Sequence, residues 1–343
     1  LGIGDTTSTG IPELITTLQS VNTVSVIGGY NATIFLIDDG NVWSTGADTT
    51  SINAGSARTA PAQYSGIDSV VEITGAFHTS YCSAFALQSD GDMYALGYNG
   101  YGQLGLGDTT NRSAWTQTGG STNFAAAFFD GSSASTVGIA LEGVSGDLFD
   151  TTTGTNIYLC GFNTYGILMQ NNTTHSSAWV QPLTTTYGTS YFKNVTASAD
   201  GTATTTNITF PRTKIKAVYP AEQYAGYTGL LMVDDQDRMW YSGYFYYNYG
   251  YQANTTSLTT LSLAFPYPSP WNHNLSSGSK FAGNSQVTIE DIYCQKSVGT
   301  TVYHNYFLRD SSGGIWYHGE QYHNMGGAGA TGPKVHWARL GTS

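Results

Sequence analysis

The stretch YALGYNGYGQLGLGDTT, residues 94–110, decides the fold of this chain. It begins as an apolar-aromatic strand and ends as a loop in which glycine recurs every second or third position. Gly97 permits a positive φ or a close backbone approach, both of which a Cβ would resist. Asn99 and Gln103 carry side-chain amides that can satisfy loop backbone groups without ladder partners. The stretch therefore predicts a strand followed by a tightly folded loop.

Parts of this stretch recur along the chain. Five strand-like runs end in a glycine, and each has an aromatic residue three positions before that glycine. The first two of these glycines, Gly46 and Gly97, are 51 residues apart. Asn163 repeats the loop asparagine, whereas the first loop has lost both amides. Repeated units of this size stack because each leaves an apolar face that its neighbour buries. The five pairs are Trp43 with Gly46, Tyr94 with Gly97, Tyr158 with Gly161, Trp240 with Gly243, and Trp316 with Gly319.

The order aromatic, two residues, Gly, any residue, Asn, two residues, Gly-Gln-Leu-Gly, any residue, Gly resembles the repeat of the regulator-of-chromosome-condensation family. Gly97, Asn99, Gly102 and Gln103 carry this resemblance. The resemblance is close over residues 71–120 and fair over the first third of the chain. In the last half, only the order strand, turn, strand remains. The resemblance implies an all-β propeller of four-stranded blades, six or seven in a complete ring, with loop insertions in the C-terminal half.

We expect residues 1–343 to form a single β-propeller, with successive blade repeats at about 21–70, 71–120, 121–186, 187–270 and 271–343. Residues 1–20 are expected to be the end of a truncated repeat, because LGIGDTT at 1–7 nearly copies LGLGDTT at 104–110. This copy predicts that the chain is the C-terminal part of a longer polypeptide or a processed product. A second architecture is two β-rich domains divided within the polar stretch 184–213.

The amino-acid composition and net charge narrow the classes of partner that we expect this chain to bind. Charged residues make up 10% of the chain, against roughly 25% in an average soluble domain, while 42 Gly and 25 Tyr favour strands and turns over helices. The formal charge is −11, and no cations cluster as they do where a phosphate backbone is bound. No apolar run reaches the roughly 18 residues that span a bilayer. The sequence predicts neither a nucleic-acid partner nor a membrane span.

The candidate chemical groups have simpler structural interpretations. Four histidines near the C-terminus lack a third ligand at a recognisable metal spacing, and the aspartate pairs recur where hairpin turns are expected. The three cysteines lie far apart and are read as small buried hydrophobes or unassigned thiols. We therefore expect no metal, no cofactor and no catalytic residue. The groups considered are His304, His318, His323 and His336; Asp38, Asp39, Asp90, Asp92, Asp234, Asp235 and Asp237; and Cys82, Cys160 and Cys294.

A tyrosine-rich run is the strongest binding candidate. Tyrosines offer rigid, amphipathic contact area that suits protein or sugar surfaces. The competing interpretation is that several of these rings pack between blades. The candidate ligand-binding residues are Tyr244, Tyr246, Tyr247, Tyr249, Tyr251 and Trp271.

In the resembled family, the propeller is a scaffold whose faces bind partners. Low charge with abundant Thr, Ser, Asn, Gly and Tyr is typical of virion fibres, spikes and extracellular surface proteins. We expect a non-enzymatic structural and adhesive propeller on a virion or cell surface, binding protein partners in a larger assembly or a host glycan or protein through blade-face loops. The alternatives are a secreted monomeric inhibitor or protein-binding module, and an enzyme acting on polysaccharide.

Overall fold

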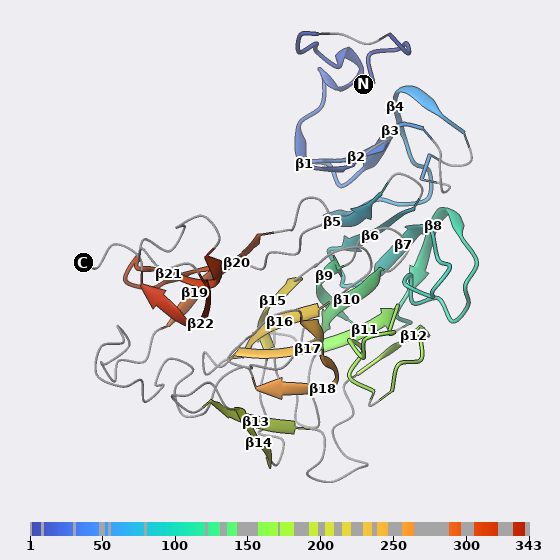
Figure 1. Cartoon of the computed structure of the whole chain (residues 1–343). Helices are drawn as coiled ribbons and strands as arrows, with labels where there is room; N and C mark the ends of the chain where they lie inside the picture. Colours follow the sequence, from blue (N-terminus) through green and yellow to red (C-terminus); the bar gives the residue numbers. More distant parts are fainter. Residues whose placement is uncertain are drawn as a thin grey trace. The chain divides into compact units, whose positions relative to one another are not determined.

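The regular secondary structure of the described residues consists almost entirely of β-strands (Figure 1). The computed structural model describes residues 2–7, 10–29, 32–47, 52–53, 56–78, 81–120, 123–130, 136–142, 157–170, 172–181, 192–197, 203–208, 215–220, 229–234, 239–245, 256–263, 288–295, 305–321 and 332–339. Among these, one short 3₁₀ helix occurs, η1 (Thr16–Leu18). The all-β fold implied by the repeat resemblance, and favoured by the composition, is confirmed. The chain divides into two compact units, with residues 1–150, 157–162 and 175–180 in the first.

The first unit contains three four-stranded antiparallel sheets, each built from consecutive strands. We call each sheet a blade. Blade 1 comprises β1 (Thr23–Gly28), β2 (Ala32–Ile37), β3 (Val42–Gly46) and β4 (Arg58–Gln63). Blade 2 comprises β5 (Val70–Phe77), β6 (Cys82–Gln88), β7 (Met93–Gly97) and β8 (Arg112–Thr118). Blade 3 comprises β9 (Phe124–Asp130), β10 (Val137–Glu142), β11 (Ile157–Gly161) and β12 (Ser176–Val180).

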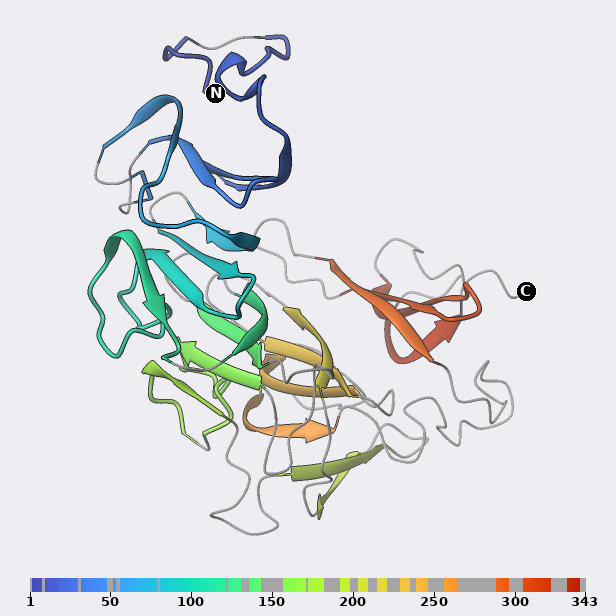
Figure 2. The same ribbon diagram turned by 180° about the vertical axis from the view of Figure 1, so that it is seen from behind.

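The second unit contains two further sheets, seen from behind in Figure 2. Blade 4 comprises β15 (Ile215–Pro220), β16 (Gly229–Asp234), β17 (Met239–Phe245) and β18 (Thr256–Leu263). Blade 5 comprises β19 (Ile289–Gln295), β20 (Asn305–Asp310), β21 (Ile315–Gln321) and β22 (Gly332–Arg339). The polar stretch 184–213 supplies a hairpin, β13 (Phe192–Ala197) and β14 (Ala203–Ile208), which extends blade 4 through a parallel pairing of β13 with β18.

The five blades share one register. The predicted aromatic residue is always the second residue of the third strand and pairs with the second strand, as in Ala86 with Tyr94. The predicted glycine is always the fifth residue of the third strand, and each pairing with the fourth strand shifts register just before it. The aromatic positions are Trp43, Tyr94, Tyr158, Trp240 and Trp316. The spacing read from the sequence therefore marks one equivalent site in every blade.

The glycine is required at this bulge. Gly46, Gly97, Gly161 and Gly243 have φ between 93° and 110°, which a residue with a Cβ rarely adopts. A Cβ on Gly97 would also collide with the carbonyl oxygen of Cys82 on the neighbouring strand. The bulge turns the chain into the loop that reaches the next blade.

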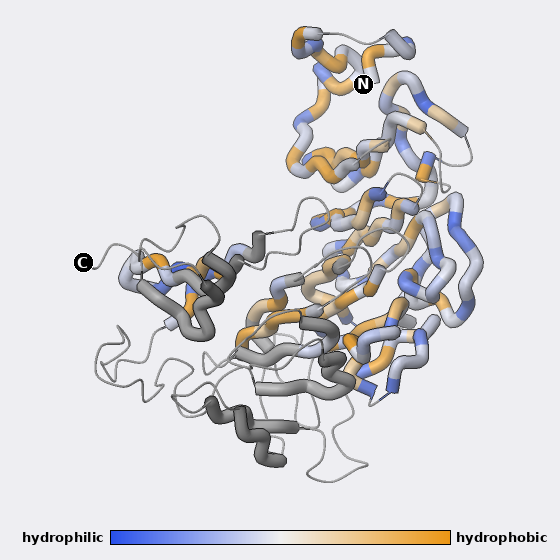
Figure 3. The backbone as a smooth tube through the Cα atoms, viewed as in Figure 1, coloured by the Kyte–Doolittle hydropathy of each residue, from blue (hydrophilic) through white to orange (hydrophobic). Residues whose placement is uncertain are grey.

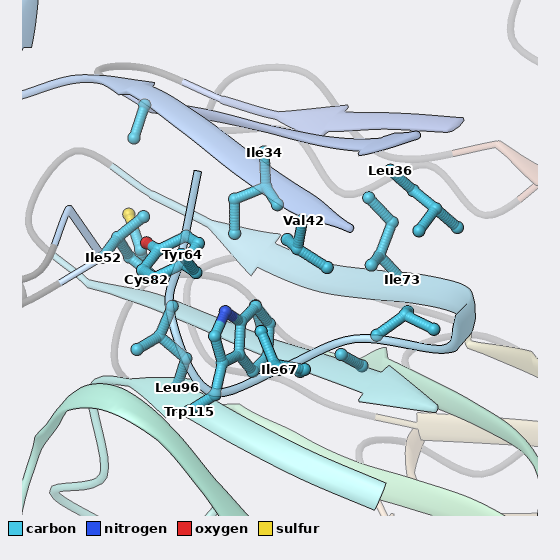
Figure 4. Packing of buried hydrophobic residues seen from close by; sticks show 14 residues of the cluster. Ile34, Leu36, Val42, Ile52, Tyr64, Ile67, Ile73, Cys82, Leu96 and Trp115 are labelled. Carbon is cyan, nitrogen blue, oxygen red and sulfur yellow. The ribbon is translucent and has the colours of Figure 1, made fainter. Parts of the chain in front are cut away.

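Neighbouring blades of the first unit pack face to face. Blades 1 and 2 bury one cluster that includes Ile34, Val42 and Ile73 (Figure 4). Blades 2 and 3 bury another that includes Phe85, Met93 and Phe124. The apolar residues concentrate in the strands rather than in the connections (Figure 3). First strands contact each other, β1 with β5 and β5 with β9, and within the second unit β15 with β19. Each buried aliphatic side chain stabilises the fold by roughly 1.5–3 kcal/mol.

The aspartates of the β2–β3 and β6–β7 connections act as turn residues, as predicted. Asp39 Oδ1 accepts a hydrogen bond from Asn41 N at 3.0 Å, and Asp90 Oδ1 accepts one from Asp92 N at 3.1 Å. The equivalent turn of blade 5 holds a buried carboxylate. Asp310 accepts bonds from Gly314 N at 2.7 Å and Trp316 Nε1 at 2.7 Å. Burial raises the pKa of Asp310, but hydrogen bonds from Ser312, Trp316 and Gly314 outweigh it and lower the pKa to about 2.

Candidate functional site

The loop after the third strand is organised by one asparagine. Asn99 is fully buried; its Oδ1 accepts from Leu104 N at 2.9 Å, and its Nδ2 donates to Asp108 O at 2.9 Å. Asn163 repeats this in blade 3, with Leu168 N at 2.9 Å and Thr174 O at 2.9 Å. The predicted role of the Asn99 amide is confirmed. Each asparagine side chain supplies hydrogen bonds to loop backbone groups that have no neighbouring strand to pair with.

The same loop inserts into the neighbouring blade. The backbone of Gln103 lies against blade 3, where a Cβ on Gly138 would come within 2.6 Å of the Gln103 carbonyl oxygen. Cys160 Sγ donates to that oxygen at 3.3 Å. In the second unit Ser242, the residue before Gly243, donates through Oγ to Ile167 O at 3.1 Å. Gln103 and Ile167 therefore occupy equivalent contact positions, although their side chains differ.

In blade 1, a different asparagine binds the backbone of the loop that follows the third strand. The sequence predicted a loop without the family asparagine, and the structure places Asn53 there instead. Its Nδ2 donates to Gly46 O at 2.8 Å and to Ala47 O at 3.0 Å, and the residue is fully buried. Ile52 packs beside it and faces Gly97 of the next blade. Asn53 was missed because its spacing from Gly46 differs from that of Asn99 from Gly97.

Aromatic rings gather where the loops of blades 2 and 3 meet. Tyr81 lies against Tyr98 with ring centroids 4.5 Å apart. Tyr101 makes edge contacts with Phe162 at 5.2 Å and with His175 at 4.9 Å. Phe162 and His175 stack at 5.1 Å. We call Tyr81, Tyr98, Tyr101, Phe162 and His175 the aromatic loop cluster. Such rings offer apolar faces together with hydroxyl and imidazole groups.

The sequence positions these rings through the repeat. Tyr98 and Phe162 each follow the bulge glycine directly, and Gly100 leaves room for the Tyr98 ring, which a Cβ would strike. Phe162 is buried, the three tyrosines are half-buried, and His175 is exposed. The cluster therefore combines a buried base with a solvent-facing rim, as expected of a contact surface.

Burial also changes the acid-base properties of this cluster. Partial burial raises the pKa of Tyr98, and the neighbouring Tyr101 and Tyr81 phenols raise it further. Partial burial lowers the pKa of His175, because desolvation disfavours imidazolium. At neutral pH both shifts favour uncharged rings, which suits stacking and hydrogen bonding more than ion pairing.

Of the residues predicted to bind a ligand, the structure describes Tyr244 alone. Strand β17 ends at Phe245, so Tyr244 lies in the strand, where its backbone pairs with Ser257. Tyr246, Tyr247, Tyr249, Tyr251 and Trp271 lie outside the described residues. That binding assignment stays a prediction. The aromatic loop cluster was missed, although the repeated order Gly, Tyr or Phe, Asn, any residue, Tyr in both loops was a readable signal.

The metal candidates gain no support from the part of the chain that the structure describes. Within it, no group of three or more His, Cys, Asp or Glu side chains could hold a metal ion. His304 and His323 lie outside the described residues. Cys82 and Cys160 are buried free thiols, and burial raises the pKa of Cys160 well above its ordinary value. Among the described helical residues, none forms a helix long and apolar enough to cross a bilayer.

Solved structures resemble this chain over most of its length, although no family model matches it. The structure of human WBSCR16 aligns with a TM-score of 0.59 and 14% identity, covering 94% of this chain and 68% of that one. Yeast RCC1 (Prp20) bound to Kap60 aligns with a TM-score of 0.54 and 12% identity, covering 96% and 63%. The chain has an RCC1-type β-propeller fold. The resemblance read from residues 94–110 is confirmed at the level of the fold.

The comparisons with RCC1-type structures also show how much of such a propeller this chain covers. Prp20p from Saccharomyces cerevisiae, in a structure concerned with binding to Gsp1p and histones, aligns with a TM-score of 0.51, 12% identity, and coverage of 94% and 64%. The chain spans about two thirds of the length of these propellers. At such low identities the likeness concerns the fold, and residue roles must come from this chain's own contacts.

Proposed function

We propose that this RCC1-type propeller is a non-enzymatic scaffold that binds a partner protein through the aromatic loop cluster. The observation that carries the proposal is the packing of Tyr101 and His175 against the buried Phe162 ring, with Tyr98 close enough to Tyr101 for the two phenols to interact electrostatically. Tyrosine-rich, partly buried surfaces are typical of protein contact sites. Protein partners are also named for the similar yeast propeller: Kap60, Gsp1p and histones.

The net charge of the chain indicates which kind of partner surface we expect it to bind. The chain carries a formal charge of −11 with only 12 Lys and Arg. A neutral or basic protein surface is therefore favoured over a nucleic acid, because phosphate binding needs clustered cations. Histones serve as a basic probe and Gsp1p as a second probe taken from the yeast comparison.

A binding measurement tests the site. We expect the chain to bind one probe protein saturably in biolayer interferometry, with Tyr101→Ala weakening the affinity at least about tenfold, as for a contact-centre aromatic. Val71→Ala is the matched control, because Val71 is exposed at the opposite end of β5 from the Tyr81 loop. Equal loss in both variants, or none in Tyr101→Ala, would reject the cluster as the contact site.

We further propose that the scaffold serves in a virion fibre, spike or other extracellular surface assembly. The support is compositional: 10% charged residues with abundant Gly and Tyr. Native mass spectrometry of the source particle tests this proposal. Recovery of the chain only as a free secreted monomer would favour the inhibitor or protein-binding alternative.

A further inference from the structure

Two tyrosines of blade 2 lie ring against ring within the aromatic loop cluster. The ring centroids of Tyr81 and Tyr98 are 4.5 Å apart, and the two ring planes are inclined by 54°. The other ring contacts described above for the cluster join unlike side chains, namely Tyr101 with Phe162 and His175, and Phe162 with His175. Tyr81 and Tyr98 therefore form a pair of phenols in direct ring contact.

Backbone hydrogen bonds hold both members of this pair in place. Tyr98 N donates to Cys82 O at 2.7 Å, and Ser83 Oγ donates to Tyr98 O at 2.8 Å. Tyr81 O accepts from His78 N at 2.9 Å in the connection between β5 and β6. The two tyrosines thus flank the paired strands β6 and β7 at the same end. The ring contact is built into the blade because the backbone fixes both attachment points.

The surrounding loop keeps the pair partly open to solvent. Tyr81 and Tyr98 are both half-buried, so a reagent in solution can reach each ring. A Cβ on Gly100 would strike the hydroxyl end of the Tyr98 ring, so the glycine makes room for that ring over the loop backbone. After burial, the phenols of Tyr101 and Tyr81 are the further causes of the raised pKa of Tyr98. The hydroxyl ends of these rings therefore also lie near one another.

The thiol beside the pair is shielded. Cys82 follows Tyr81 directly, and a thiol can quench a phenoxyl radical by giving up its hydrogen atom. Cys82 is buried, and its Sγ donates to His78 O at 3.5 Å. Buried thiols outside electropositive surroundings are poorly reactive. A radical on Tyr81 therefore has the ring of Tyr98 as its accessible reaction partner.

We propose that Tyr81 and Tyr98 form an oxidative modification site, at which a haem peroxidase and hydrogen peroxide join the two rings as dityrosine. Each phenol loses one electron and one proton and becomes a phenoxyl radical. The radicals couple through the ring carbons next to the hydroxyls, and the hydrogens on those carbons move to the oxygens and restore both phenols. One C–C bond forms, the O–O bond of the peroxide breaks, and the peroxide takes up two electrons and two protons to give two water molecules.

The product ties the β5–β6 connection to the loop that follows β7. The link lies within one blade, so it requires neither a bound partner nor a second copy of the chain, and it does not rest on the proposed binding function. A covalent link between separated residues constrains the unfolded chain and thereby favours the folded one. We expect the linked chain to melt at a higher temperature than the unmodified chain.

Peptide mapping of the oxidised chain tests the site. The dilute chain is treated with a haem peroxidase and hydrogen peroxide, and the monomer is isolated and cleaved before aspartate residues. This cleavage separates residues 68–89, in which Tyr81 is the single tyrosine, from residues 92–107, which hold Tyr94, Tyr98 and Tyr101. We expect the two peptides to be linked, with a combined mass lowered by two hydrogen atoms. Tandem mass spectrometry should place the link at Tyr98.

Three variants complete the test. Tyr81→Phe keeps an aromatic ring but cannot form a phenoxyl radical, so the linked peptide pair should be lost. Tyr101→Phe should retain it, because the ring of Tyr101 contacts Phe162 and His175 instead. Cys82→Ala removes the thiol as a radical quencher. The proposal is overturned when the monomer of both the unmodified chain and Cys82→Ala lacks the linked pair, when the link joins Tyr94 or Tyr101 instead of Tyr98, or when it survives in Tyr81→Phe.

Discussion

The loops of blades 2 and 3 carry out the same structural task with partly different residues. Both follow a bulge glycine, Gly97 or Gly161, and both close on a buried asparagine with nearly identical bonds. The contact residue differs, because Gln103 is replaced by Ile167. The comparison teaches that backbone conformation and the asparagine bonds hold the loop, while the contact side chain is free to vary.

The outer ends of these loops differ as well. In blade 2, Asp108 forms an ion pair with Arg112 at 2.7 Å. In blade 3, Asn172 and Ser176 stand at those positions, and Asn172 Oδ1 still accepts from Thr174 N at 2.9 Å. The turn bond is thus retained and the charge pair is not. Exposed ion pairs contribute little to stability, so their loss is tolerated.

The largest loss of folding stability is expected when the bulge glycine is replaced. Gly97→Ala should destabilise the fold by about 3–4 kcal/mol, because it adds positive-φ strain to a collision with Cys82 O. Gly107→Ala is the matched control, with φ of +83° but open space around its Cβ, and should cost about 1 kcal/mol. Urea denaturation measures both. Equal losses would show that backbone conformation alone requires the glycine.

The next largest effect concerns the shared asparagines. Asn99→Ala and Asn163→Ala should each cost about 2–3 kcal/mol, because the buried amides of Leu104 and Leu168 lose their acceptors. Asn41→Ala should cost less than about 1 kcal/mol, because the bond from Asn41 Nδ2 to Asp39 Oδ2 at 2.8 Å is exposed and water can replace it. A full loss from only one of the two loop asparagines, in thermal or urea unfolding, would contradict their equivalence.

A residue swap probes where the two loops differ. Gln103→Ile places the blade 3 residue in blade 2 and should change stability by less than about 1 kcal/mol. Gln103 Nε2 is buried and has no hydrogen-bond partner among the described residues, so its loss removes a desolvation cost while Tyr101 N loses its bond to Oε1 at 3.0 Å. The reverse change, Ile167→Gln, should be the more destabilising of the two. The opposite order in calorimetry would assign the glutamine a larger structural role.

The smallest effect is a change in titration. The hydrogen bond from Arg112 is the main cause of the lowered pKa of Asp108, with further lowering by Thr110 N. The folded chain is thereby stabilised above the unfolded aspartate pKa of about 3.9, and this gain is lost as pH falls through the lower folded value. Arg112→Ser should raise the pKa of Asp108 toward its ordinary value in a ¹³C NMR titration. Arg58→Ser should leave it unchanged, and an unshifted Asp108 in Arg112→Ser would contradict the assignment.

Much of this architecture was readable because it depends on local chemistry. Gly97 and Asn99 are required by a bulge and a loop whose backbone groups have nearby partners, so their spacing survives in the sequence. Asn53 was not readable, because a different loop length places an equivalent amide at a different sequence distance. The aromatic loop cluster was missed because Tyr81 and His175 reach it from segments far apart in the chain.

The sequence by itself determined the all-β repeat, the five aromatic-glycine strands and the loop asparagines, because each follows from short-range backbone requirements. Only the tertiary structure decided which loop rings converge and which apolar positions are covered. Val26 and Ile73 hold equivalent pairing positions on the first strands of blades 1 and 2, yet one is exposed and the other buried. Burial depends on whether a neighbouring blade packs on the strand, and no single repeat contains that information.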